Sequence, residues 1–89
     1  MNIKFAKKFV KQYSKAPQKI KKAFNLRLEI FRNNSFHSLL NNHSLTGSYL
    51  KSRSINITGD WRAIYSEILE NNEKITIFLA FGTHSQLYK

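Results

Sequence analysis

The spacing of apolar residues changes near the middle of this chain, and that change restricts its fold more than any other feature. Phe5, Phe9 and Tyr13 recur every four residues, which places them on one face of a helix. A second run at helical spacing covers residues 20–31. Beyond residue 53 the apolar residues alternate or become continuous, as is typical of strands. The sequence therefore predicts helices first and strands after them.

Two breaks delimit the predicted helices. Pro17 ends the first run and suits the start of the second helix, because its ring fixes φ near the helical value. The segment Asn33-Asn34-Ser35 ends the second run, since these side chains favour turns. We expect an antiparallel helical hairpin around a short connection, with the lysines of the first helix mostly off its apolar stripe.

Three later segments have the composition of strands. Residues 54–57 alternate, residues 61–69 are rich in aromatic and branched side chains, and residues 75–81 form the most apolar run. We expect the last of these to be the central strand, ending at Gly82-Thr83-His84. Short turns join the strands, so the chain should be one α+β domain over residues 1–89. Its helices should pack on one face of an antiparallel sheet.

The charge of the chain indicates a polyanionic partner. Fifteen Lys and Arg face five Asp and Glu, giving a net charge of +10. The lysines are concentrated in residues 1–22. Such a surface attracts polyanions by counterion release, so nucleic acid is the first candidate partner and an acidic protein the second. A merely soluble basic surface is the plain alternative.

Composition also argues against several classes of protein. The chain has no cysteine, so it has neither disulfides nor a zinc-thiolate site, which suits a reducing cytoplasm. No long apolar run is present, and we therefore expect neither a signal peptide nor a membrane span. The basic amphipathic start leaves a membrane-surface helix or a targeting peptide as alternatives. No HExxH motif or glycine-rich phosphate loop is present, so we expect no metal site and no cofactor.

The remaining polar residues suit cleavage of an RNA phosphodiester. RNA carries its own nucleophile, the 2′-hydroxyl, so a protein has only to move two protons and neutralise charge on the phosphorus. Histidines and a carboxylate can transfer the protons, and arginine can bind the phosphate. The candidates are His43, His84, Asp60, Arg53 and Arg62.

Each candidate also has a plain structural interpretation. His84 could cap the end of the last strand, and His43 could be an ordinary loop residue, as we take His37 to be. Asp60 follows a glycine and suits a turn. Arg62 could lie at the edge of the sheet. Interpreted without comparison to any known family, these residues indicate a basic α+β domain that binds an anion.

Three motifs together resemble the RelE/ParE toxin superfamily, and most closely its YafQ-like branch of messenger RNA interferases. They are HSLTG at residues 43–47, RSINITGDWRAIY at residues 53–65 and GTHSQLY at residues 82–88. Each motif is weak alone, but their order in a short basic chain is specific. The basic helical hairpin before them also fits, so the resemblance spans nearly the whole chain.

The resemblance implies a fold like that of microbial ribonucleases, with two helices against a curved antiparallel sheet. It implies the toxin of a type II toxin–antitoxin system, which cleaves messenger RNA without a metal, typically in the ribosomal A site. It further implies a cognate antitoxin that wraps the toxin and blocks its site.

The motifs also imply roles for particular residues. Arg62 matches a position where relatives carry a phosphate-binding arginine, and Arg53 would assist it. His84 would be the general acid, with Asp60 or His43 as the base. An aromatic residue near the end would stack on a base or position the phosphate; without the resemblance it would be an exposed ring. The implied catalytic residues are His43, Asp60, His84 and Tyr88.

One position departs from the pattern of these relatives. Some YafQ-like members have a further histidine four residues before the aspartate, where this chain has Asn56. Asparagine can hydrogen-bond the substrate but cannot shuttle a proton near neutral pH. Asn56 is therefore expected to bind substrate rather than to exchange protons.

Two other functions are compatible with the net charge of +10. A ParE-like toxin of this fold would inhibit DNA gyrase by binding and would cleave no RNA. A non-catalytic nucleic-acid-binding module would show salt-dependent affinity and no products. Neither needs an acid–base set, so His43, Asp60 and His84 favour the nuclease.

Overall fold

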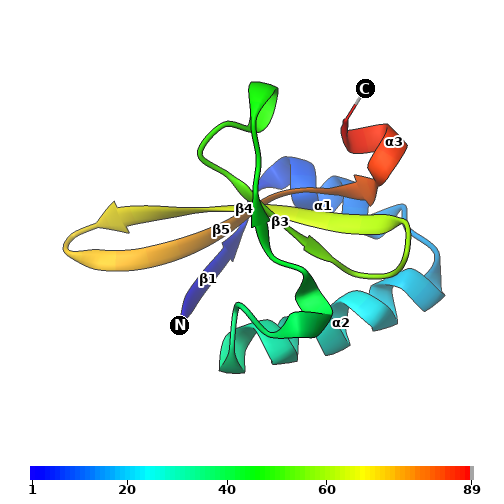
Figure 1. Ribbon diagram of the computed structural model, residues 1–89, viewed down its shortest axis with the longest axis horizontal. Coiled ribbons are helices and arrows are strands. Elements are labelled where there is room, and N and C mark those ends of the chain that lie inside the picture. Colours follow the sequence, from blue (N-terminus) through cyan, green and yellow to red (C-terminus); the bar gives the residue numbers. More distant parts are fainter. Residues whose placement is uncertain (89) are drawn as a thin grey trace.

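Five strands form one sheet in the computed structural model, which describes residues 1–88, and three α-helices pack against it (Figure 1). The predicted α+β class, with a helical hairpin on a sheet, is confirmed. None of the helices in residues 1–88 is long and apolar enough to cross a membrane. In chain order the elements are β1 (Asn2–Phe5), α1 (Lys7–Ser14), α2 (Gln18–Asn33), β2 (His43–Ser44), β3 (Arg53–Asn56), β4 (Trp61–Glu70), β5 (Glu73–Thr83) and α3 (His84–Leu87), with 3-10 turns η1 (Ser38–Leu40) and η2 (Gly47–Tyr49).

The strands lie in the order β1-β5-β4-β3-β2. From β5 to β2 all neighbours are antiparallel, as predicted, and β1 adds a parallel edge strand to β5. The strand at residues 75–81 is therefore interior, between β1 and β4, while β4 occupies the middle of the sheet.

Strand β1 was not predicted, because Phe5 continues the four-residue spacing of the first helix. In the structure Phe5 ends β1, Ala6 is extended with ψ of 154°, and α1 begins at Lys7. The ring of Phe5 still lies 5.3 Å from Phe9 and 5.7 Å from Phe78. The four-residue spacing of Phe5 and Phe9 therefore reflects their packing in the same core and not their position on one continuous helix.

The main core lies between the sheet and both long helices. Phe9 of α1 and Phe24 of α2 pack against Phe78 and Phe81 of β5, with ring centroids 5.3–5.7 Å apart. Tyr65 is buried beside Phe31 on the same face. Edge-to-face and tilted arrangements of this kind add to the stabilisation that burial of the rings provides.

The opposite face of the sheet carries a second, smaller core. Ile64, Ala80 and Leu87 are buried there, so β4 and β5 are covered on both faces over part of their length. This double burial explains why the last strand is apolar without alternation. Helix α3 supplies Leu87 to this core.

Helix α3 was not predicted, because four residues are too few to show a helical period. Its start is fixed by a capping box, in which Thr83 Oγ1 accepts from the Gln86 N–H and Gln86 Oε1 accepts from the Thr83 N–H. A Cβ on Gly82 would lie 2.9 Å from Gln86 Oε1. Glycine at this position therefore lets α3 fold back onto the sheet.

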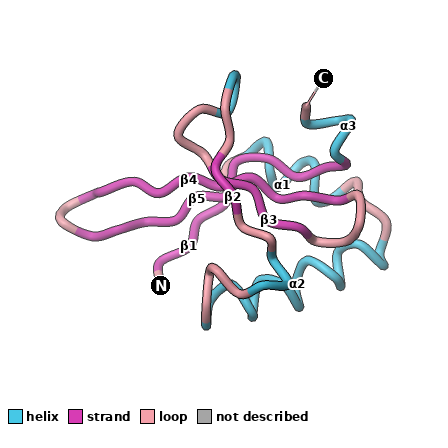
Figure 2. Tube along the Cα trace, viewed as in Figure 1, coloured by secondary structure: helices cyan, strands magenta, loops and turns pink. Residues whose placement is uncertain are grey.

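Strands β4 and β5 also form a hairpin that projects from the side of the molecule (Figure 2). Asn71 and Asn72 turn it with φ of 51° and 64°, values that asparagine tolerates better than most residues. The exposed ion pair of Lys74 with Glu67 lies along this hairpin.

Candidate active site

A hollow of about 300 Å³ opens on the sheet face away from α1 and α2. It gathers five of the seven predicted site residues, which come from three strands, from α3 and from the residue that follows α3. The side chains that line it are Asn41, His43, Leu45, Asn56, Arg62, His84 and Tyr88.

The register of the strands explains this convergence. Arg62 of β4 pairs with Asn56 on one side and with Gly82 on the other. His43 of β2 pairs with Ser54, which is two residues from Asn56 on the same strand. Because alternate residues of a strand face the same way, these side chains share one face. Gly82 has no side chain, and α3 begins two residues after it.

The hydrogen bond of His43 determines how its ring can act. His43 Nδ1 lies 2.8 Å from the carbonyl oxygen of Asn41. A carbonyl can only accept, so Nδ1 carries the proton and the neutral ring keeps its lone pair on Nε2. The geometry therefore prepares His43 Nε2 to accept a proton.

Arg62 is anchored by the turn that joins β3 and β4. Its Nη1 donates to the carbonyl oxygens of Thr58, Gly59 and Trp61, each at 3.1 Å. Among the described residues, all hydrogen bonds of this guanidinium run through Nη1. Nε and Nη2 therefore remain to bind an anion in the hollow.

Asp60 lies next to the hollow without lining it. Its carbonyl oxygen accepts from the backbone N–H of His84 at 2.9 Å, while its side chain is exposed to solvent. The structure thus brings Asp60 beside His84 through the backbone. The imidazole of His84 packs against the ring of Tyr88, with centroids 4.7 Å apart.

Arg53 is the predicted site residue that the structure places on the other face of the sheet. Its Nε donates to Asn42 Oδ1 at 2.7 Å, and its guanidinium lies 5.0 Å from the centre of the Phe36 ring. Asn42 in turn donates to the hydroxyl of Tyr65 at 2.7 Å, and burial raises the pKa of that tyrosine. Arg53 therefore ties β3 to the segment that follows α2 and does not reach the hollow.

Comparison with known proteins identifies the family. The sequence model of "Bacterial toxin of type II toxin-antitoxin system, YafQ" matches residues 1–89. The chain belongs to the YafQ toxin family. No curated protein matches it by sequence alone.

Solved structures of YafQ and RelE toxins share this fold. YafQ from E. coli strain BL21(DE3) is 21% identical with a TM-score of 0.79, over 99% of this chain and 98% of that one. YafQ in the E. coli DinJ–YafQ toxin–antitoxin complex is 22% identical with a TM-score of 0.75, over 99% and 97%. The RelB–RelE antitoxin–toxin complex from Methanococcus jannaschii is 26% identical with a TM-score of 0.69, over 96% and 94%.

Two residues that line the hollow of this YafQ-family chain, Asn56 and Tyr88, carry buried polar atoms, and so does Ser54, which the sequence analysis did not name and which lies on the same face of β3 as Asn56. Ser54 Oγ, Asn56 Oδ1 and Tyr88 Oη are buried and have no hydrogen-bond partner within residues 1–88. A buried polar atom without a partner is costly, so such atoms are normally satisfied by water or by a ligand. Ser54 could have been found from the sequence, because alternation places it on the same face as Asn56.

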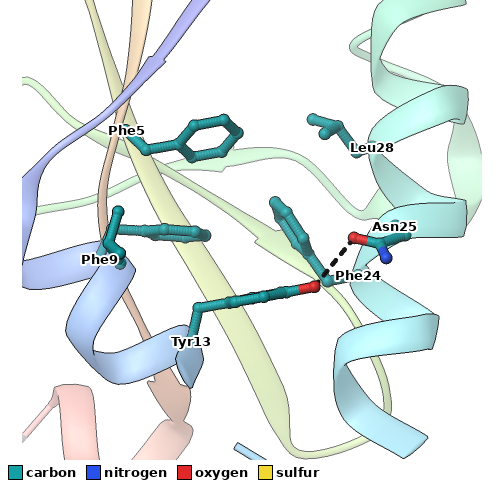
Figure 3. A pocket seen from close by; sticks show the side chains of 7 residues that line it. Phe5, Phe9, Tyr13, Phe24, Asn25 and Leu28 are labelled. Atoms are coloured by element: carbon teal, nitrogen blue, oxygen red, sulfur yellow. Dashed lines mark hydrogen bonds between the residues drawn. The ribbon is translucent and has the colours of Figure 1, made fainter. Parts of the chain in front are cut away.

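A second hollow, of about 330 Å³, has a different character. It lies between α1 and α2 and is lined by Phe5, Phe9, Val10, Tyr13, Phe24, Asn25 and Leu28. Figure 3 shows Phe5, Phe9 and Tyr13 on one side of it and α2 on the other, with the Tyr13 hydroxyl donating to Asn25 Oδ1. It offers no acid–base pair, so the hollow around His43 and His84 is the candidate active site.

Proposed function

We propose that this toxin is an endoribonuclease that cleaves messenger RNA on the ribosome, using neither a metal nor a cofactor, and so inhibits translation. The observation that carries the proposal is the convergence of His43, His84 and Arg62 around one hollow. Two imidazoles can serve as the base and the acid, and one guanidinium can bind the phosphate, in cleavage by the 2′-hydroxyl of RNA.

In the proposed reaction His43 is the general base. Its Nε2 takes the proton of the 2′-hydroxyl, and the 2′-oxygen attacks the adjacent phosphorus. The bond from phosphorus to the 5′-oxygen breaks, and the His84 imidazolium gives its proton to that leaving oxygen. The products are a 2′,3′-cyclic phosphate and a 5′-hydroxyl. Arg62 binds the non-bridging oxygens, on which negative charge develops.

His43 is favoured over Asp60 as the base because its ring lines the hollow with a free Nε2, whereas Asp60 does not line the hollow. Asp60 then acts on the site through the backbone hydrogen bond that fixes the start of α3. Asn56 binds substrate, and Tyr88 stacks on a base or positions the phosphate. Arg53 has a structural role.

The charge and the solved relatives support the proposed partners. A net charge of +10 suits messenger RNA and ribosomal RNA. The relatives solved as DinJ–YafQ and RelB–RelE complexes support a cognate antitoxin for this chain as well. We place the protein in the cytoplasm, where messenger RNA and ribosomes meet.

Induced expression without antitoxin tests the proposal, with growth followed and the 5′ ends of cellular transcripts mapped. The wild type should arrest growth and create new 5′ ends inside coding regions, and His84→Ala should do neither. His37→Asn is the matched control, because His37 only caps η1 and asparagine can also cap. Arrest without new RNA ends would contradict the proposal and favour gyrase or another target.

A further inference from the structure

Tyr49 does not line the candidate active site but contacts Tyr88, which does. Its ring meets the ring of Tyr88 edge-on, with centroids 6.0 Å apart and an interplanar angle of 84°. Tyr88 in turn packs against the imidazole of His84, at 4.7 Å and 55°. The three rings form a row, Tyr49–Tyr88–His84, that leads from the β2–β3 loop to the candidate acid.

The β2–β3 loop holds Tyr49 in a defined place. The Leu45 N–H donates to the Ser52 carbonyl at 3.0 Å, and the Ser52 N–H donates to the Tyr49 carbonyl at 2.9 Å. The 3-10 turn η2 begins at Gly47, whose φ of 65° suits glycine. Tyr49 also packs, with Leu45 and Tyr88, against the small core on this face of the sheet. The loop therefore presents a fixed aromatic ring to Tyr88.

Tyr88 and His84 have few other restraints. Helix α3 is a single turn, and the Tyr88 N–H donates to the His84 carbonyl at 3.0 Å. The Tyr88 hydroxyl is buried without a partner, and no hydrogen bond holds the His84 ring to a residue in the range 1–88. The orientation of the His84 ring thus depends on packing against Tyr88, and that of Tyr88 on packing against the small core and Tyr49.

We propose that Tyr49 is a positioning residue for His84: it holds the Tyr88 ring edge-on, and that ring sets the direction of the His84 imidazole. The inference rests on the proposed function for the role of His84 as acid. The ring of Tyr49 does this without its hydroxyl, and it does not touch the RNA. Tyr49→Phe should therefore keep the His84 ring in position, and Tyr49→Ala should not.

NMR of the imidazole protons tests the ring contact independently of catalysis. The resonances of His84 would be compared at one fixed pH in the wild type, Tyr49→Ala, Tyr49→Phe and Tyr88→Leu. Tyr88→Leu removes the aromatic ring beside His84 and so shows the His84 resonances without the ring-current shift that Tyr88 causes. Tyr49→Ala should move the His84 resonances towards that reference, and Tyr49→Phe should leave them as in the wild type. His84 resonances unchanged in Tyr49→Ala would overturn the inference.

Cleavage kinetics, measured on ribosomes carrying messenger RNA, test whether the ring contact affects catalysis. Tyr49→Ala should lower kcat by up to about tenfold with KM unchanged, and Tyr49→Phe should restore it. Leu50→Ala is the matched control, because Leu50 is the next residue of the loop and is 66% exposed. A rise in KM without a fall in kcat would overturn the inference, since it would make Tyr49 a substrate contact. Absence of cleavage by the wild type would instead refute the proposed function and leave the NMR result standing.

Discussion

The carbonyl oxygen of Asp60 accepts a hydrogen bond from the backbone N–H of His84 at 2.9 Å, so the β3–β4 turn and the start of α3 meet beside the hollow. The same turn supplies the carbonyl groups of Thr58 and Gly59 that anchor Arg62. One turn therefore positions both the candidate acid and the candidate phosphate ligand, although neither residue belongs to it.

The two candidate bases can be separated by substitution. Asp60→Asn removes the carboxylate but keeps the backbone carbonyl that bonds His84, so kcat should fall by less than about tenfold. His43→Ala removes the free Nε2 and should lower kcat by about 10²–10⁴-fold. Single-turnover cleavage of ribosome-bound messenger RNA measures both. The reverse order of the two losses would make Asp60 the base.

Arg62→Ala should lower kcat more than it weakens RNA binding, by about 10²–10³-fold, because the charge that it neutralises develops in the transition state. Arg62→Lys should recover only part of the rate, since lysine lacks the planar pair of donors. Arg53→Lys is the matched control on the other face of the sheet. Equal losses of kcat/KM and of RNA affinity would show that Arg62 only binds.

Gly82→Ala should displace α3. The new Cβ would lie 2.9 Å from Gln86 Oε1, and moving that side chain breaks the capping box. The free energy of unfolding should fall by about 1 kcal/mol, and activity should fall because His84 begins the displaced helix. Gly59→Ala is the control, as its Cβ would meet nothing within 4 Å. Urea unfolding measures the change, and equal stability of the two variants would contradict this account.

Tyr65 should make the fold sensitive to alkaline pH. Burial raises the pKa of its hydroxyl above 10.0. The stabilisation of the neutral form is therefore fully present below the pKa of the unfolded chain, near 10, and is lost as pH rises through the folded pKa. Tyr65→Phe should be less stable than the wild type at pH 7 by about 1 kcal/mol, because Asn42 loses its acceptor. Across pH 9–11 this deficit should shrink in urea unfolding, and a constant deficit would contradict the prediction.

The sequence predicts the long elements well, because each has a period that its residues must satisfy. The helix expected at residues 20–31 is α2 (Gln18–Asn33), and the strand expected at residues 75–81 is β5 (Glu73–Thr83). Strand β1 and helix α3 are too short to establish a period. Both are fixed by tertiary contacts, β1 by pairing with β5 and α3 by its capping box over Gly82.

The candidate site was predictable as a set of residue types but not as an arrangement. Arg53 and Ser54 are neighbours, and only the register of β3 decides which of them faces the hollow. Alternation groups Ser54 with Asn56, but which face of β3 carries the hollow depends on its register with β2 and β4, and the residue types do not reveal that register. The ring of Tyr49 was missed for a related reason, because its contact with Tyr88 joins segments 39 residues apart.

The most direct test of the central claim uses a messenger RNA with a single 2′-deoxyribose at the cleavage position, bound to ribosomes and incubated with purified toxin. Our account predicts that the all-ribose messenger RNA is cut to a 2′,3′-cyclic phosphate and a 5′-hydroxyl. The substituted messenger RNA should stay intact at that position. Cleavage of the substituted messenger RNA, or products with a 5′-phosphate, would contradict the proposed attack by the 2′-hydroxyl and with it the roles of His43 and His84.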